Sequence, residues 1–331
     1  MMTIKSGTKS PSDAFALALN RNPTLNLPSI FVKTLAEPLS EATATADKAL
    51  SGLLSELFKA RLTSLVLLTT LVGFYLGQRG GMNWLLLINT LLGTGLLACG
   101  AAALNQYLER DFDALMDRTA DRPLPAGLIQ PQTVVVLGGV LSVAGLLWLA
   151  FGANLLTAVL GAVTLISYLF IYTPLKRKTT LNTAIGAIPG ALPPLMGWTA
   201  ARGDLSIEGW ALFAILFFWQ LPHFLAIAWM YREDYAKGGF VMLPLVDRDG
   251  TRTGRSAVSH TLGLLPVSLS PFVFQMSGAL YLAGALVLGL VFLWFAGRFA
   301  KQMDRLSARR LFFASILYLP LLLGLMVFDK Q

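Results

Sequence analysis

Long apolar runs separated by short polar segments make up this 331-residue chain from about residue 60 onward. A transmembrane α-helix needs about 20 mostly apolar residues. Nine runs are long enough: residues 62–78, 83–104, 132–152, 154–172, 182–201, 209–230, 257–275, 277–296 and 311–328. The breaks at 152/154 and 275/277 are so short that each is either a tight hairpin or a bend within one segment. The pattern predicts an all-α, polytopic integral membrane protein with nine transmembrane helices.

Composition and charge agree with this fold class and orient it. The chain is 55% hydrophobic and only 13% charged, with a mean hydropathy of +0.64. Lys and Arg favour cytoplasmic loops. The connections after the second, fourth, sixth and eighth spans carry 16 of them, whereas the other connections and the C-terminal tail carry only Arg79, Arg202 and Lys330. We therefore expect a cytoplasmic N-terminus. The net charge of +8 indicates topology and contact with membrane lipids, not nucleic acid, because no exposed basic domain is visible.

The polar start of the chain predicts a disordered tail over residues 1–54, ahead of a membrane domain over residues 55–331. It has no apolar core of a secretory signal. Its Ser- and Thr-rich, acid-poor composition faintly resembles a mitochondrial transit peptide, but it holds one arginine, Arg21. We expect a bacterial cytoplasmic (inner) membrane, with the mitochondrial inner membrane as the alternative. The single cysteine, Cys99, excludes an internal disulfide and a thiol metal site.

A dense polar cluster follows the second predicted span. Four oxygen-bearing side chains recur at intervals of four residues: Asn105, Glu109, Asp113 and Asp117. On a helix continuing that span they would form one stripe. Such oxygens suit Mg²⁺, which bridges to substrate phosphates. Three nearby arginines could bind phosphate oxygens: Arg110, Arg118 and Arg122. The alternative is a solvated helix with ion pairs between successive turns.

Two further connections on the same side carry charge. After the sixth span, Glu233 and Asp234 are candidate metal ligands, and Arg232 and Lys237 are candidate phosphate contacts. After the fourth span, a basic run could hold a polyanion: Lys176, Arg177 and Lys178. Both segments can equally be read as basic flanks that set topology.

His223 is one of two histidines and lies inside the sixth predicted span. It could ligate iron, act as a base, or be a buried hydrogen-bonded group, and the residues alone favour the last. The fifth span holds Pro189, Pro193 and Pro194 among several glycines. Proline at this density predicts a kinked helix, which can open a cavity.

Together these motifs resemble the protohaem IX farnesyltransferase (haem O synthase) branch of the membrane-embedded aromatic-prenyltransferase superfamily. The matching strings are Asn105-Gln-x-x-Glu109-Arg-Asp-x-Asp113, Tyr172-Thr-x-Leu-Lys176-Arg177, Trp219-Gln-x-Pro-His223-Phe, Asp234-Tyr-x-x-Gly238-Gly-x-x-Met242-Leu-Pro244 and Ser315-Ile-x-Tyr318-Leu-Pro320. The resemblance covers roughly residues 55–325, and its specificity comes from the combination of strings.

The resemblance implies nine helices around a lipid-open cavity capped by charged cytoplasmic loops. It implies that the farnesyl group of farnesyl diphosphate joins a vinyl group of haem B, with addition of water, to give haem O. The implied cofactor is Mg²⁺, and a further partner is the haem A synthase that uses the product. The implied catalytic residues are Asn105, Glu109, Asp113 and Asp234. The implied diphosphate contacts are Arg110, Arg118, Arg122, Lys176, Arg177, Arg232 and Lys237, with His223 as the haem contact. Aromatic side chains are available for an allylic cation: Tyr107, Phe112, Tyr172, Trp219 and Tyr235.

Two departures and two rival functions remain. Gln106 and Glu109 stand where the wider superfamily has aspartates, and its second Asp-x-x-x-Asp motif is not reproduced near Tyr235. The number of Mg²⁺ ions is therefore open. One rival is a prenyltransferase acting on a quinone or chlorophyll precursor. The other is a transporter, which would place its site near the membrane midplane, whereas these acids gather at one face.

Overall fold

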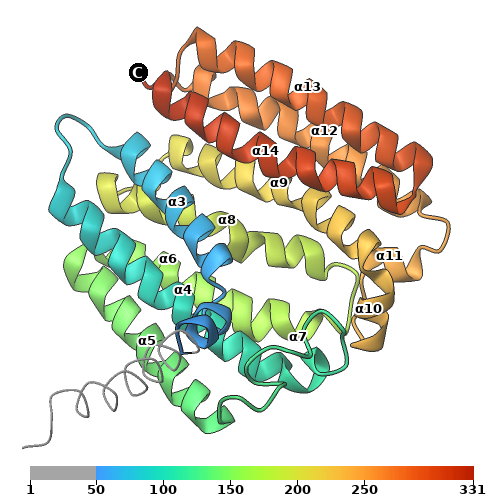
Figure 1. The fold of residues 1–331 in the computed structure, drawn as a ribbon. Coiled ribbons are helices and arrows are strands. Elements are labelled where there is room, and N and C mark those ends of the chain that lie inside the picture. The colour runs from blue at the N-terminus through green and yellow to red at the C-terminus, as the bar shows by residue number, and fades with distance from the viewer. Residues whose placement is uncertain (1–49) are drawn as a thin grey trace, which may run out of the picture. The chain divides into compact units, whose positions relative to one another are not determined.

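The structure is a computed structural model that describes residues 50–331, and helices dominate that range (Figure 1). Most of the predicted polar tail, residues 1–49, lies outside the described residues. Residues Leu54–Gln331 form one compact unit. The all-α prediction is confirmed, since the described range contains a single isolated β-bridge, between Ser277 and Lys330.

The helices follow one another along the chain with short connections. They are α3 (Ala60–Gly77), α4 (Trp84–Asp113), α5 (Pro131–Gly152), α6 (Leu155–Ile166), the π-helix η1 (Ser167–Tyr172), α7 (Thr173–Leu175), α8 (Asn182–Arg202), α9 (Ile207–Met230), α10 (Arg232–Lys237), α11 (Leu243–Val246), α12 (Thr251–Val273), α13 (Ala279–Gln302) and α14 (Arg305–Phe328). Figure 1 shows α12, α13 and α14 side by side, α4, α5 and α6 grouped apart from them, and α3, α8 and α9 in between.

Within residues 50–331, eight helices are long and apolar enough to cross a membrane, and this is a membrane protein. The α6–η1–α7 run counts as one of them, over Leu155–Leu175. The fifth predicted span corresponds to α8, a 21-residue helix that is not among the eight. Its prolines, glycines and Asn182 make it less apolar, and most of its residues are buried inside the protein. A helix surrounded by protein needs less apolar surface than one facing lipid.

Both short breaks in the hydrophobic pattern are hairpins. Between α5 and α6, the Asn154 side chain accepts a hydrogen bond from the backbone N–H of Thr157 at 2.8 Å and so caps the new helix. Between α12 and α13, the chain turns through residues 274–278, with Gln275 at a φ of 56°. Both segments therefore end and restart as separate helices.

Two boundaries at the charged end of the bundle differ from the prediction. The helix that continues the second span ends at Asp113, so Asp117 lies in the following turns and not on the predicted stripe. Helices α13 and α14 are joined by Met303 and Asp304 alone, so basic residues expected in a loop there lie on helix ends. Long basic side chains can extend to water from a helix end, which is why the basic residues did not mark the connection between α13 and α14.

Helices α3 and α8 cross at a distance that only glycine permits. A Cβ atom on Gly73 would collide with the carbonyl oxygen of Pro194, and one on Gly197 with the carbonyl oxygen of Thr70. Small residues at such crossings allow close backbone packing in membranes. This crossing holds α8 in the middle of the bundle, where it lines the cavity described below.

We expect Gly73→Ala and Gly197→Ala each to lower the free energy of unfolding by about 1–3 kcal/mol, because the new methyl group must push the α3 and α8 backbones apart. The measurement is denaturant unfolding of the purified protein in detergent. Gly139→Ala is the matched control, since a Cβ there meets open space. Equal stability of all three variants would contradict the crossing.

Candidate functional site

A buried ion pair lies where α4 meets the segment that follows α7. The Lys176 Nζ atom is 2.8 Å from Oε1 and 3.0 Å from Oε2 of Glu109. Glu109 is on the last turns of α4 and is only 5% exposed. A buried carboxylate is costly without a partner, so Lys176 stabilises the position of Glu109. Burial works to lower the pKa of Lys176, but the nearby Glu109 carboxylate outweighs it and raises that pKa.

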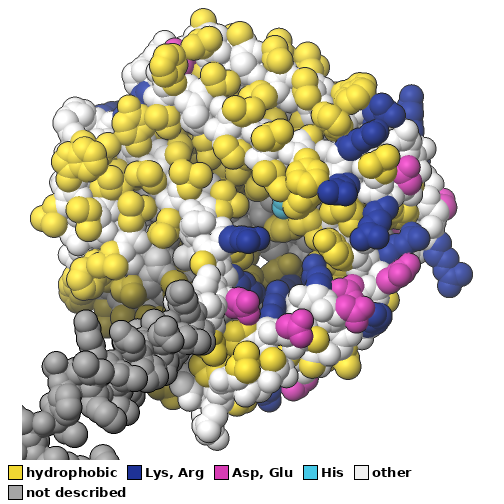
Figure 2. Space-filling model, viewed as in Figure 1, with side chains coloured by type: hydrophobic (Ala, Val, Ile, Leu, Met, Phe, Trp, Pro, Cys, Tyr) yellow, Lys and Arg dark blue, Asp and Glu magenta, His cyan; other side chains and the backbone are white. Residues whose placement is uncertain are grey.

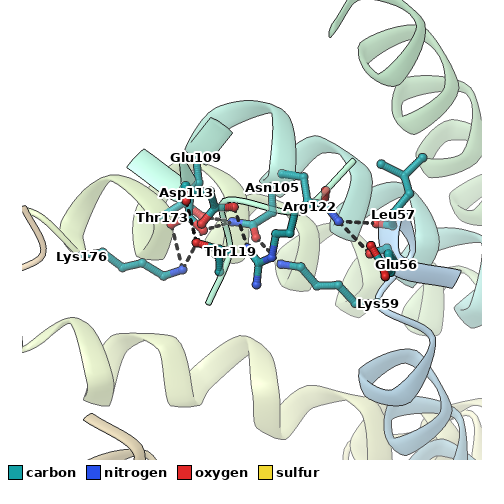
Figure 3. Close-up of polar contacts among 11 residues, drawn as sticks. Glu56, Leu57, Lys59, Asn105, Glu109, Asp113, Thr119, Arg122, Thr173 and Lys176 are labelled. Atoms are coloured by element: carbon teal, nitrogen blue, oxygen red, sulfur yellow. Dashed lines mark hydrogen bonds and ion pairs between the residues drawn. The ribbon is translucent and has the colours of Figure 1, made fainter. Parts of the chain in front are cut away.

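Asn105, one turn before Glu109, joins this pair to two other parts of the chain. Its amide nitrogen donates to Oε2 of Glu109 and to the Thr173 hydroxyl, both at 3.1 Å. Its amide oxygen accepts from Nζ of Lys59 at 2.6 Å (Figure 3). The Thr173 hydroxyl in turn donates to the carbonyl oxygen of Tyr168 in the π-helix η1, at 2.9 Å. Insertions of π-helix are frequent at functional sites.

Asp113 ends α4 and completes the cluster. Its Oδ2 atom accepts from Nη1 of Arg122 at 2.6 Å, and its backbone carbonyl accepts from the Thr119 hydroxyl at 2.7 Å. The cluster of Asn105, Glu109, Asp113, Lys59, Arg122 and Lys176 is hereafter called the polar cluster (Figure 3). It holds two carboxylates and three cations. When Lys59 is protonated, the cluster carries one excess positive charge, which favours an anion as its ligand.

Lys59 was not predicted as a site residue. It immediately precedes α3 at a φ of 49°, an unusual value for a residue other than glycine. Gln106 holds this segment in place, because its amide nitrogen donates to the carbonyl oxygens of Glu56 and Leu57 at 2.8 and 3.0 Å. Burial and then the Arg122 charge lower the pKa of Lys59 to about 7. In the sequence, a lysine at the start of a span indicates only topology.

The second charged segment packs against the turns after α4. The carboxylate of Asp234, in α10, accepts from the backbone N–H groups of Asp117 and Arg118 at 3.1 and 3.3 Å. Lys237 donates to Oδ2 of Asp117 at 2.6 Å, and both side chains are exposed. The Arg118 guanidinium lies 4.2 Å from the Tyr235 ring centroid. These contacts join α10 to the turns after α4. They also mean that Asp234 and Asp117 bond to each other's segments and not to the polar cluster.

The other predicted basic residues make contacts of their own. Arg110 pairs with Asp111 at 3.4 Å, Arg177 lies 3.8 Å above the Phe112 ring, and Arg232 lies 4.9 Å from the Trp229 ring. Figure 2 shows basic and acidic side chains gathered along the side of the molecule where α10 and α11 lie, around a hollow. The charged side chains therefore surround the site on that side. The contacts of Arg110, Arg177 and Arg232 do not involve the polar cluster.

Among residues 50–331 there is no group of three or more His, Cys, Asp or Glu side chains able to hold a metal alone. The predicted ligand set is therefore not a complete cage. However, Mg²⁺ is commonly held by one or two carboxylates together with substrate phosphates. Oε1 of Glu109 is buried, and apart from its ion pair with Lys176 it has no hydrogen-bond partner among the described residues. With Asp113 one turn further along α4, the residues present fit a Mg²⁺ ion of that bridging kind.

An apolar cavity of about 320 Å³ begins at Lys176 and extends into the bundle. Helices α3, α4, α6, η1, α8, α9 and α14 line it. Its few polar side chains include Lys176, Gln220 and His223. Leu62 on α3 and Phe224 on α9 line the cavity and are also exposed, so it opens sideways between these helices. The cavity volume is at the lower end of the range for small-molecule sites.

His223 lies among aromatic rings on this wall. Its ring stacks on Trp219 and Phe312, with centroids 5.2 and 5.1 Å away. Its Nδ1 atom is 2.7 Å from the hydroxyl oxygen of Ser315 on α14, whose carbonyl accepts from the Trp219 indole at 2.8 Å. These contacts join α9 to α14 and fix the orientation of the imidazole.

Comparison with known proteins gives consistent results. The model of the UbiA prenyltransferase family matches residues 66–317. A protoheme IX farnesyltransferase of Solibacter usitatus is 50% identical over 284 residues, which are 83% of this chain and 97% of that protein. The human mitochondrial protoheme IX farnesyltransferase is 42% identical over 282 residues, which are 85% of this chain and 63% of that protein.

Solved structures show the same fold at low sequence identity. A structure of digeranylgeranylglyceryl phosphate synthase superposes with a TM-score of 0.72 at 14% identity, covering 84% of this chain and 97% of the other. A UbiA homolog from Archaeoglobus fulgidus bound to GPP and Mg²⁺ gives a TM-score of 0.58 at 16% identity, covering 83% and 99%. At these identities the likeness concerns the fold alone.

We expect Lys176→Met to lower the free energy of unfolding by about 3–5 kcal/mol, because Glu109 would be left buried without its partner. The double variant Lys176→Met/Glu109→Gln should recover most of this loss, as measured by denaturant unfolding in detergent. Lys178→Met, which changes an exposed neighbour, is the control. If the double variant is no more stable than Lys176→Met, the ion pair is not the cause.

Proposed function

The chain belongs to the UbiA prenyltransferase family, and from this we infer that it transfers the farnesyl group of farnesyl diphosphate to a vinyl group of haem B. Water adds to the product, giving haem O and releasing diphosphate. The observation that carries the proposal is that one side chain, Lys176, belongs both to the cationic polar cluster and to the wall of the apolar cavity. A prenyl diphosphate has the same two parts, an anionic head and an apolar tail.

The polar cluster suits the diphosphate group. Diphosphate leaves readily only when its developing charge is neutralised. Lys59, Lys176 and Arg122 present three cations at the end of α4, while Glu109 and Asp113 hold two of these cations in place. We assign diphosphate binding to these three cations first. Arg110, Arg118, Arg177, Arg232 and Lys237 remain candidates for contacts at the rim.

Mg²⁺ fits the same place. When bound, the ion would neutralise charge on the diphosphate oxygens as a Lewis acid, and Glu109 and Asp113 are the residues that would hold it. Asn105 orients Lys59 and Glu109 through its amide group, and its role as a ligand stays a prediction. The same is true of Asp117, which pairs with Lys237.

The cavity suits the farnesyl chain and the cation that forms from it. Tyr168, Tyr172 and Trp219 line the cavity next to mostly aliphatic side chains. Aromatic faces attract a cation, and dry walls keep water from capturing it early. Of the five aromatic residues predicted for this purpose, Tyr172 and Trp219 line the cavity, whereas Tyr107, Phe112 and Tyr235 do not.

The acceptor would enter from the membrane. The cavity opens sideways between α3 and α9, next to His223, which we assign as a haem contact. We place the protein in the bacterial cytoplasmic membrane, with the N-terminus cytoplasmic and the polar cluster facing the cytoplasm. A haem A synthase is the partner that would consume the product. Residues 55–331 carry the whole reaction in this proposal.

We expect the purified protein, incubated with haem B, farnesyl diphosphate and Mg²⁺, to form a product with the mass of haem O. A parallel incubation with an aromatic quinone precursor in place of haem B should give no prenylated product. Mass spectrometry of both incubations is the measurement. Prenylation of the quinone precursor, without haem O, would favour the rival prenyltransferase function.

We expect Asp113→Ala to lower kcat by at least about 100-fold, because it removes a carboxylate of the polar cluster and the partner of Arg122. Membrane insertion should be unchanged, since the helices do not depend on this side chain. Asp111→Ala, an exposed acid two residues away, should keep normal activity. Normal turnover by Asp113→Ala would remove Asp113 from the site.

A further inference from the structure

The hydrogen bonds of Ser315 define which nitrogen of His223 carries a proton. The Ser315 hydroxyl oxygen is 2.5 Å from the carbonyl oxygen of Phe312, and only the hydroxyl hydrogen can make that bond. The same oxygen is 2.7 Å from Nδ1 of His223 and must therefore accept a hydrogen bond there. A neutral imidazole with a proton on Nδ1 has a lone pair on Nε2.

That lone pair has no partner among the described residues. His223 lines the cavity, its ring stacks on Trp219 and Phe312, and Nδ1 is engaged by Ser315. Within residues 50–331 Nε2 makes no hydrogen bond, and it is not among the fully enclosed polar atoms of that range. It is therefore open to a ligand. An imidazole held only for packing would more often have both nitrogens satisfied, because unpaired polar atoms in apolar surroundings are costly.

This arrangement is typical of a metal-ligating histidine. Such residues usually donate their second ring N–H to an oxygen atom, which fixes the tautomer and the ring orientation. Ser315 does this for His223, and the stacked Trp219 and Phe312 rings restrict rotation of the imidazole. The described residues form no group of three or more His, Cys, Asp or Glu side chains that could hold a metal ion by themselves, so a metal at His223 would arrive with the ligand.

The position of His223 suits a large planar molecule that enters from the lipid. The residue is seven positions before the end of α9, which at 1.5 Å per residue is about 10 Å from the charged end. Its neighbour Phe224 lies at the side opening of the cavity. A porphyrin bound there would share the cavity with Lys176 of the polar cluster, where the farnesyl chain would lose its diphosphate.

We propose that Nε2 of His223 is the axial ligand of the iron of haem B when this substrate binds, and that Ser315 is the positioning residue that presents it. The proposal rests on the proposed function, because it takes haem B as the acceptor. It also gives a basis for acceptor choice. A quinone precursor has no metal to coordinate and gains nothing from this side chain.

The test is resonance Raman spectroscopy of the full-length protein in nanodiscs with reduced haem B, without farnesyl diphosphate or Mg²⁺. We expect an iron–histidine stretching band that His223→Ala abolishes and that added imidazole restores. The chain has only two histidines. His260→Ala is the matched control, because His260 also bonds a serine, Ser256, but does not line the cavity. An unchanged band in His223→Ala would overturn the proposal.

Ser315→Ala tests the positioning role. Loss of the hydroxyl should shift the iron–histidine band and weaken haem binding by about tenfold. A band and an affinity identical to those of the unmodified protein would show that Ser315 does not position the imidazole.

If His223→Ala does not fold, His223→Phe keeps an aromatic ring next to Trp219 and Phe312 and should also lack the band. The haem O assay separates the two proposals: haem O formation with an unchanged band in His223→Ala sinks the ligation alone. A histidine band without haem O sinks the transferase activity alone.

Discussion

The buried ion pair between Lys176 and Glu109 is the interaction on which the site depends. It places two opposite charges at the end of an apolar cavity, where neither would be stable alone. Because Glu109 is on α4 and Lys176 follows α7, the pair fixes the end of the π-helix against the longest helix of the bundle. Asn105 then extends the same set of contacts to Lys59 and hence to the start of α3. Three helices thus meet at one point through side chains that are also available to an anion.

The cavity exists because the helices around it are held by contacts elsewhere. Glycines at the crossing of α3 and α8 let these backbones approach, and the prolines of α8 lie in the same segment. On the opposite wall, Trp219 and His223 bond to one residue of α14, Ser315. The site is therefore built from rigid helices with few connecting loops at its centre, which suits chemistry that must exclude water.

The charged end of the bundle carries many exposed charges, but they matter less for stability and for the site than their number suggests. The side chains of α10 and of the turns after α4 bond mainly to one another, as in the contacts of Asp234 with Asp117 and Arg118. Exposed ion pairs of this kind contribute little to stability. Their evident effect is to join the two loops beside the polar cluster.

Much of this protein was determined by the sequence alone. Long apolar runs identified the eight candidate membrane spans and also the helix α8, and the spacing of Asn105, Glu109 and Asp113 placed them on one helix face, since both patterns are local. Other features required the tertiary structure. Asp117 left the stripe because α4 ends at Asp113, and Lys59 joined the site through its hydrogen bond to Asn105, 46 positions away. The partner of His223 is 92 residues distant. Such pairings depend on how helices pack, and a single sequence records each helix's own pattern but not which side chains its neighbours bring to it.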